Sequence, residues 1–232
     1  MYDYVEDKEF LRKAQADCSQ MMRELEDELR EDGINTQFFL VGSGARNMVM
    51  QNGDGPIDFD YNLNIISCDD ISDCRSIKEA VRKAFNRVLD NYRLPNVSDS
   101  TIPLTTRPIH YTNDPDNEFT IDVCIVRKVN EKWERLKHEK TGIWQNDRYY
   151  WNIAPNSNKY AEKAKAIKTV PGWWEVVRQQ YKDIKNMYLS RNDHDHPSFV
   201  CYVEAVSNVY NNMRQKGLLF NIDFSNKNCI KL

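Results

Sequence analysis

The chain has 232 residues, 41% of them hydrophobic and 11% aromatic, which is enough for one large domain or two small ones with a packed core. Its 32 basic and 35 acidic residues nearly cancel to a net charge of −3, so charge gives no reason to expect sequence-independent binding to long nucleic acid. The six cysteines lack metal-site spacing, the N-terminus has no apolar signal region, and no segment approaches membrane-spanning length. We therefore expect a cytoplasmic protein with reduced thiols and no membrane contact.

Apolar spacing predicts a first helix from Val5 to Arg30, ended by Gly33. A strand over 37–41 then runs into the turn Gly42-Ser43-Gly44. Such a turn lets backbone N–H groups and a hydroxyl face a phosphate, and glycines allow its close approach. We expect a short helix-like stretch over 45–50 after it.

A second strand is predicted from Ile57 to Ile66, and it contains Asp58 and Asp60. Side chains alternate along a strand, so both carboxylates point to one face. Two residues span roughly 6.5 Å along a strand. That separation suits two carboxylates that grip a pair of divalent ions about 3.5–4 Å apart.

The next predicted elements are a helix and two strands. The helix begins with the capping-box pattern Ser76-Ile77-Lys78-Glu79 and has an apolar stripe to Leu89. The strands span 105–111 and 118–127, with a turn over 113–117. This order predicts a small mixed sheet with helices on one face.

Asp122 lies in the second of those strands, in a run that otherwise reads as buried. A buried carboxylate needs a partner, a proton or a metal ion. An arginine such as Arg107 on the preceding strand is one candidate partner. The other is a metal site shared with Asp58 and Asp60, if their strands lie side by side.

From about Glu131 the pattern changes to helices, predicted over 133–138, 159–169, 171–190 and 197–216. The expected domains are therefore 1–130 and a helical lobe over 131–232. His194-Asp195-His196 precedes the last helix and either binds a metal or caps the helix and faces water. The tail 220–232 fits either a short strand or docked coil.

The sequence resembles the nucleotidyltransferase superfamily, which includes DNA polymerase beta, antibiotic nucleotidyltransferases, template-independent RNA polymerases and oligonucleotide cyclases. The resemblance covers about the first 130 residues. It rests on three separated motifs, Phe39-Leu40-Val41-Gly42-Ser43, Pro56-Ile57-Asp58-Phe59-Asp60-Tyr61 and Thr120-Ile121-Asp122-Val123. It implies an α+β fold, with a small mixed sheet as catalytic domain and a helical lobe that holds base and acceptor.

The hypothesis is a metal-dependent nucleotidyltransferase that moves a nucleoside monophosphate from a nucleoside triphosphate to an acceptor hydroxyl and releases pyrophosphate. Asp58, Asp60 and Asp122 are the predicted catalytic residues and ligands of two Mg²⁺ ions, which Mn²⁺ can replace. The predicted triphosphate-binding residues are Gly42, Ser43, Gly44 and Arg46.

Several alternatives stay open at this stage. The acceptor is a small molecule, a nucleotide or a protein, and the preferred triphosphate is not readable from the sequence. Arg46 and Asn47, or Lys163, Lys165 and Lys168, either reach a phosphate or lie on solvated helix faces. Asn62 and Asn64 continue the Asp58 face, while Tyr149-Tyr150-Trp151 and Trp173-Trp174 either stack a base or pack in a core. Rival functions are a catalytically silent nucleotide-binding regulator on the same fold and an Asp-x-Asp glycosyltransferase.

Overall fold

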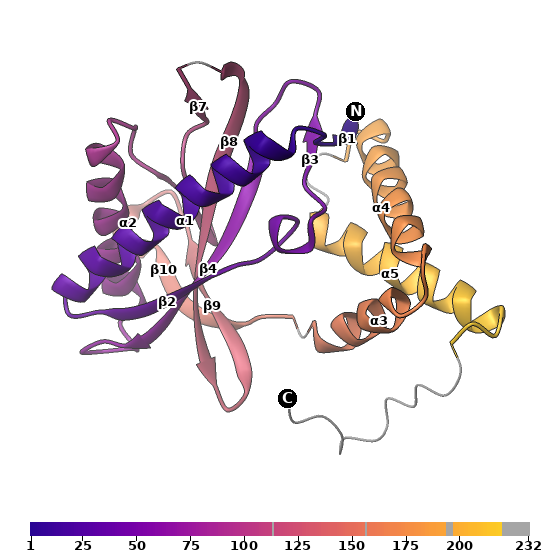
Figure 1. Cartoon of the computed structure of the whole chain (residues 1–232). Coiled ribbons are helices and arrows are strands. Elements are labelled where there is room, and N and C mark those ends of the chain that lie inside the picture. Colours follow the sequence, from indigo (N-terminus) through magenta and orange to yellow (C-terminus); the bar gives the residue numbers. More distant parts are fainter. Residues whose placement is uncertain (113, 156, 194–196, 220–232) are drawn as a thin grey trace. The chain divides into compact units, whose positions relative to one another are not determined.

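A computed structural model describes residues 1–112, 114–155, 157–193 and 197–219 of the chain. It divides into two compact units, Met1–Pro155 and Asn156–Leu232 (Figure 1). The predicted tail over 220–232 and the motif His194-Asp195-His196 lie outside the described residues.

The first unit is built on an eight-stranded mixed sheet. Its strands follow the order β10-β9-β8-β4-β2, while β6 and β7 also pair with β8, and β5 pairs with β6. The β4–β8 pair is parallel, and the other pairs of this sheet are antiparallel. The strands of this sheet are β2 (Asn35–Leu40), β4 (Ile57–Ser67), β5 (Ser98–Asp99), β6 (Pro103–Thr105), β7 (Ile109–Tyr111), β8 (Asp114–Val129), β9 (Lys132–Glu139) and β10 (Arg148–Ile153). A separate two-stranded sheet joins β1 (Tyr2–Tyr4) to β3 (Met50–Asn52).

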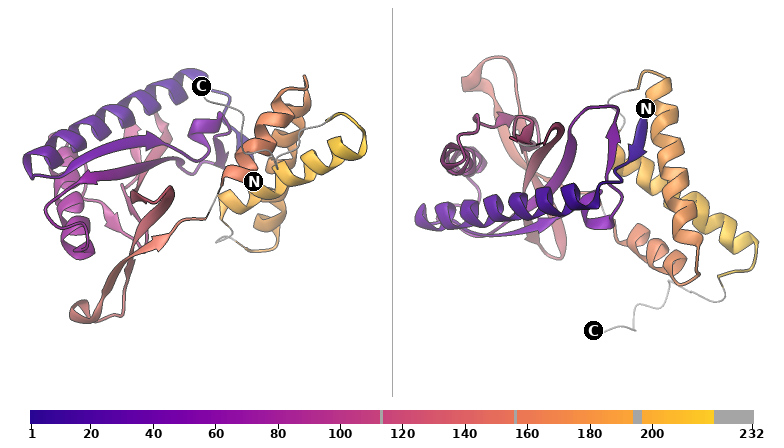
Figure 2. Two further views of the ribbon diagram at one scale, coloured as in Figure 1. Left: turned by 90° about the horizontal axis from the view of Figure 1, so that it is seen from below. Right: turned by 45° about the horizontal axis from the view of Figure 1, so that its top comes forward.

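Helices α1 (Lys8–Glu31) and α2 (Cys74–Asn91) cover one face of the large sheet. Figure 2 shows α1 running over the strands from two further directions. Their apolar stripes form a single buried cluster with alternate residues of the two central strands: Ile57, Phe59, Tyr61, Leu63, Ile65, Phe119, Ile121, Val123 and Ile125. The predicted α+β class, with helices on one face of a mixed sheet, is confirmed.

Capping side chains define where both helices begin. The carboxylate of Asp7 accepts the N–H of Phe10 at 2.9 Å and starts α1. The predicted capping box at Ser76 is wrong by one turn, because Asp73 is the N-cap of α2 and accepts both the N–H and the hydroxyl of Ser76. Aspartate is as good an N-cap residue as serine, and Asp73 lies three residues before Ser76.

The helix predicted over 133–138 is wrong, since these residues belong to β9. This strand pairs with β8 and β10, with Leu136 and His138 buried and Trp133 exposed. An apolar pattern of only six residues fits the helical period and the strand period equally well. Pairing with neighbouring strands then decides between helix and strand. The first unit consequently extends to Pro155, beyond the predicted boundary after residue 130.

The strand predicted over 105–111 is divided into β6 and β7. Pro108 lies between them and has no N–H to donate to a ladder. Strand β8 begins at Asp114, inside the turn predicted over 113–117, and Asn113 lies outside the described residues.

The second unit consists of α3 (Asn158–Lys168), α4 (Trp173–Ser190) and α5 (Ser198–Gln215), close to the three helices predicted there. The helices contact one another and bury apolar side chains, among them Ile167, Val177, Ile184, Ala205 and Val206. None of the described helices combines the length and apolar character needed to cross a membrane.

Candidate active site

The three predicted acids lie on one face of two adjacent strands. In the parallel β4–β8 pair, Asp60 is the direct cross-strand partner of Asp122, and Asp58 is the partner of Thr120. Cross-strand partners share a face, so Asp58, Asp60 and Asp122 all point away from α1 and α2. We call this side of the sheet the acid face.

Two threonine hydroxyls contact these acids. Thr120 Oγ1 donates to Asp58 Oδ1 at 2.6 Å, and Thr105 Oγ1 on β6 donates to Asp122 Oδ1 at 2.6 Å. Asp58 is exposed, whereas Asp60 and Asp122 are half-buried. The acids therefore sit in a partly desolvated patch in which hydroxyls meet some of their hydrogen-bonding capacity.

The pKa of Asp122 is raised above its ordinary value. Burial is the main cause, the Thr105 hydrogen bond opposes it, and the negative charge of Asp58 adds to it. The alternative partner Arg107 is exposed, and within the described residues it forms no ion pair with Asp122. Arg107 therefore does not offset the unfavourable effects of burial and of the Asp58 charge on the Asp122 carboxylate.

The Gly42-Ser43-Gly44 turn lies directly against Asp60. The β2–β4 ladder continues into it, since the N–H of Val41 donates to the carbonyl of Asp60 at 2.8 Å. Gly42 has a φ of +63°, and a Cβ there would lie 1.9 Å from Asp60 Oδ2. A residue with a side chain would displace the carboxylate, so glycine is required by this close approach.

The turn continues as a single 3-10 turn, η1 (Gly44–Arg46), shorter than the helix-like stretch predicted over 45–50. The Ser43 carbonyl accepts the N–H groups of Arg46 and Met48, at 3.2 and 3.0 Å. The guanidinium of Arg46, predicted to bind triphosphate, donates to the Gly42 carbonyl. In this structure Arg46 therefore braces the turn.

The side chains of these residues fit divalent cations in chemistry. Carboxylate oxygens are the ligands that Mg²⁺ and Mn²⁺ prefer, and a cation would relieve the charge crowding at Asp122. Within the described ranges, however, no three His, Cys, Asp or Glu side chains are gathered closely enough to form a ready-made metal site. The three acids share a face, and Asp58 and Asp122 each accept a hydrogen bond from a threonine hydroxyl.

The other candidate binding residues lie on the acid face, on the helix-covered face of the sheet and in the second unit. On the acid face, Asn64 Oδ1 is buried with no hydrogen-bond partner among the described residues. Tyr149 and Trp151 pack against the core on the opposite, helix-covered face. Trp173 and Trp174 lie beneath the ammonium groups of Lys216 and Lys168, at 5.3 and 4.1 Å from the ring centroids.

Lys163 is half-buried within the second unit. Its ammonium lies 3.3 Å from Ser207 Oγ and over the rings of Tyr160 and Tyr210. Burial lowers its pKa, with a smaller effect of Lys159 in the same direction. Lys165 is exposed.

A buried ionic cluster on the helix-covered side of the sheet was not predicted by any sequence motif. Lys78 is fully buried, with Nζ 2.7 Å from Asp99 Oδ1. His138 lies between two carboxylates, with Nδ1 2.7 Å from Asp99 and Nε2 3.0 Å from Asp147. The cluster joins α2, β5, β9 and the segment before β10.

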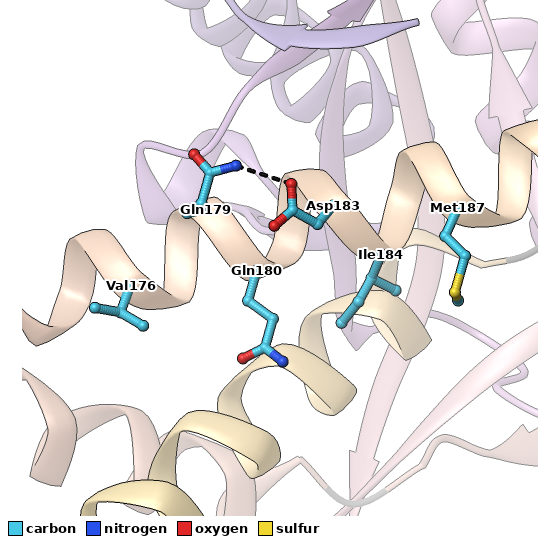
Figure 3. Close-up of a pocket in the computed structure, with 6 residues that line it drawn as sticks. All are labelled: Val176, Gln179, Gln180, Asp183, Ile184 and Met187. Carbon is cyan, nitrogen blue, oxygen red and sulfur yellow. Dashed lines mark hydrogen bonds between the residues drawn. The ribbon is translucent and has the colours of Figure 1, made fainter.

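A hollow of about 440 Å³ lies along α4 in the second unit (Figure 3). It is lined by Val176, Gln179, Gln180, Asp183, Ile184 and Met187. Gln179 donates to Asp183 at 2.8 Å within it. All the lining residues belong to a single helix, and none of the three acids is among them.

No model of a known protein family matches the chain, and no curated protein matches it either. Among solved structures, it is similar to E. coli MS115-1 CdnC with ATP, at a TM-score of 0.54 and 12% identity, covering 89% of this chain and 62% of that chain. For the CdnC:HORMA-deltaN complex, the TM-score is 0.54 and the identity 14%, and the match covers 89% of this chain and 61% of that chain. For the Bradyrhizobium diazoefficiens CD-NTase CdnG with GTP, the TM-score is 0.45 and the identity 18%, and the match covers 67% of this chain and 41% of that chain.

The chain thus spans between 41% and 62% of the length of these proteins. The similarity to CdnC shows the fold alone, which is that of the nucleotidyltransferases. The resemblance predicted from the three sequence motifs is confirmed at the level of the fold. This chain has the nucleotidyltransferase fold.

Proposed function

We propose that the protein is a metal-dependent nucleotidyltransferase. The observation that carries the proposal is the pairing of Asp60 with Asp122 across parallel strands, with Asp58 two residues away on the same face. The nucleotidyltransferase fold, and a structural neighbour described with bound ATP, support the same reaction class.

Asp58, Asp60 and Asp122 would hold Mg²⁺ or Mn²⁺, which when bound neutralises triphosphate charge and lowers the pKa of an acceptor hydroxyl. The turn Gly42-Ser43-Gly44 receives the triphosphate, because glycines leave room for phosphate oxygens and the Ser43 hydroxyl hydrogen-bonds them. The acceptor oxygen then forms a bond to the α-phosphorus as the bond to pyrophosphate breaks. Asp122 accepts the acceptor's proton and passes it to solvent.

The test is pyrophosphate release from each nucleoside triphosphate in the presence of Mg²⁺ or Mn²⁺. Asp60→Asn and Asp122→Asn keep the size of each side chain and remove its charge. We expect a loss of about 100-fold or more, the scale on which one transition-state charge partner contributes. Asp54→Asn, in the exposed turn before β4, is the matched control. Unchanged release by both acid variants would contradict the proposal.

A catalytically silent nucleotide-binding protein is the second candidate function. It is favoured by one observation, that the acids are not already gathered as a metal site. Triphosphate binding without pyrophosphate release, for any acceptor offered, would support it. The observed fold gives no support to the Asp-x-Asp glycosyltransferase alternative.

The acceptor in this proposal is a hydroxyl of a small molecule, a nucleotide or a protein. We also propose a reducing, cytoplasmic setting, because the cysteines among the described residues are free thiols. A screen of acceptors with labelled triphosphate identifies the product directly. A polymeric nucleic acid product would contradict the expectation drawn from the near-neutral charge.

A further inference from the structure

Two of the three acids on the acid face are held by hydroxyls from other positions in the sheet. Thr120 lies beside Asp58 in the β4–β8 register, and Thr105 lies opposite Asp122 in the β6–β8 register. Both O···O distances are 2.6 Å, typical of a hydroxyl that donates to an ionised carboxylate. The third acid, Asp60, is instead confined by the Gly42 backbone.

The backbone around Thr105 is anchored independently of this contact. The next residue, Thr106, donates its N–H to the Ile121 carbonyl at 3.1 Å and accepts the Ile121 N–H on its buried hydroxyl at 2.9 Å. On the other side, the buried Lys78 donates to the Ser100 carbonyl at 2.8 Å. Thr105 is thus fixed relative to Asp122, and a β-branched side chain has few rotamers to choose from.

We propose that Thr105 and Thr120 are positioning residues that orient the carboxylates of Asp122 and Asp58 before a divalent cation binds. The inference rests on the proposed function, because it assigns these carboxylates to a cation. Each hydroxyl engages Oδ1 of its acid, so the carboxylate plane is set by a neighbouring strand. A carboxylate that is already oriented loses less freedom when it ligates a metal ion.

A purely structural role for the hydroxyls would affect folding alone. The chain offers a matched control, because Thr106 is adjacent to Thr105 and its hydroxyl serves a backbone N–H instead of an acid. Valine is nearly isosteric with threonine and lacks the hydroxyl. Serine keeps the hydroxyl and loses only a methyl group.

The experiment measures Mn²⁺ binding to the full chain without nucleotide, by calorimetry and by the paramagnetic resonance signal of free Mn²⁺, together with melting temperature. We expect Thr105→Val and Thr120→Val each to weaken Mn²⁺ binding about 10- to 100-fold, the range found when a residue supporting a metal ligand is removed. Thr105→Ser should restore affinity to within about threefold of the wild type. Thr106→Val keeps the backbone hydrogen bond to the Ile121 carbonyl that anchors this segment, so it should lower the melting temperature and leave Mn²⁺ affinity unchanged.

Wild-type affinity in both Thr105→Val and Thr120→Val would overturn the inference while leaving the proposed function intact. An equal loss of affinity in Thr106→Val would also overturn it, because the effect would then follow from sheet stability. Failure of the wild type to bind Mn²⁺, or undiminished binding by Asp60→Asn, would instead overturn the proposed function and this inference together. If Thr105→Val melts below the assay temperature, Thr105→Ala replaces it, with the same expected loss and the same overturning result.

Discussion

The backbone of Gly42 occupies the space next to the carboxylate of Asp60. A Cβ built on Gly42 would lie 1.9 Å from Oδ2 and 2.8 Å from Cγ of Asp60. The turn after β2 and the second acid of β4 therefore fit together only while position 42 has no side chain. This contact links the proposed phosphate turn to the proposed metal ligand.

Gly42→Ala should reduce pyrophosphate release far more than it reduces stability. The left-handed backbone costs alanine about 1–2 kcal/mol, and the added methyl group displaces Asp60. A displacement of about 1 Å at a reacting centre can cost about 100-fold in rate. Gly53→Ala is the matched control, since Gly53 has a φ of +57° and no atom within 4 Å of its built Cβ. Equal activities of the two variants, measured beside their melting temperatures, would contradict the assignment.

Asp122→Asn should stabilise the metal-free protein at neutral pH. The folded pKa of Asp122 is raised, chiefly by burial, so the folded state holds this proton more tightly than the unfolded state. Stability is therefore lost as pH rises from the ordinary value of 3.8 through the folded pKa, and asparagine escapes that loss. Asparagine can still accept the Thr105 hydrogen bond.

The measurement is thermal unfolding of both proteins from acid to neutral pH with a chelator present. The variant's advantage should be present at pH 7 and vanish below the ordinary carboxyl pKa. Asp54→Asn should show no such trend. A variant that is less stable than the wild type at pH 7 would argue against charge crowding on the acid face.

Mg²⁺ or Mn²⁺ should raise the melting temperature of the wild type. A cation at 100 times its Kd stabilises the folded state by about 2.7 kcal/mol, and each kcal/mol shifts the midpoint by about 2–4 °C in a protein of this size. Asp60→Asn, which lacks one of the proposed ligands, should show a much smaller shift. The comparison is made by scanning calorimetry with chloride salts, and an equal concentration of K⁺ serves as the ionic-strength control.

Lys78→Met should destabilise the first unit strongly. It removes the fully buried cation beside Asp99 and leaves that carboxylate poorly compensated, which typically costs about 3–5 kcal/mol. Lys128→Met removes a surface cation from the partly exposed pair with Glu131 and should cost about 1 kcal/mol or less. Urea unfolding compares the two, and similar midpoints would show that the buried cluster is not a stabilising element.

The local pattern of apolar residues was sufficient to predict most of the helices and strands that surround the three acids. Strands β2, β4 and the central part of β8, and helices α1, α2, α4 and α5, were predicted close to their observed bounds, because each has a long and regular apolar period. The failures are short or interrupted segments. Residues 133–138 became strand because β8 and β10 offered pairing on both sides. The strand expected over 105–111 was divided at Pro108, which cannot complete a ladder.

The supporting contacts of the site were less visible. Thr120 could have been found from its position two residues before Asp122 on the same face. Thr105 could not, because its contact depends on the register of β6 against β8. The close approach of Gly42 to Asp60 likewise depends on how β2 meets β4. The ionic cluster of Lys78, Asp99, His138 and Asp147 joins residues from four separate segments.

The amino-acid sequence by itself determined which side chains share a face, because alternation along a strand is a property of the local backbone. It therefore put Asp58 with Asp60, and placed the glycines and serine at the end of β2. Only the tertiary structure decided that Asp122 lies beside Asp60 and that residues 132–153 extend the sheet. It also decided that Thr105 and Thr120 hydrogen-bond to Asp122 and Asp58. Those facts depend on strand order and register. Both are set by the burial of a shared core, whose residues are distant in sequence from the residues of the site.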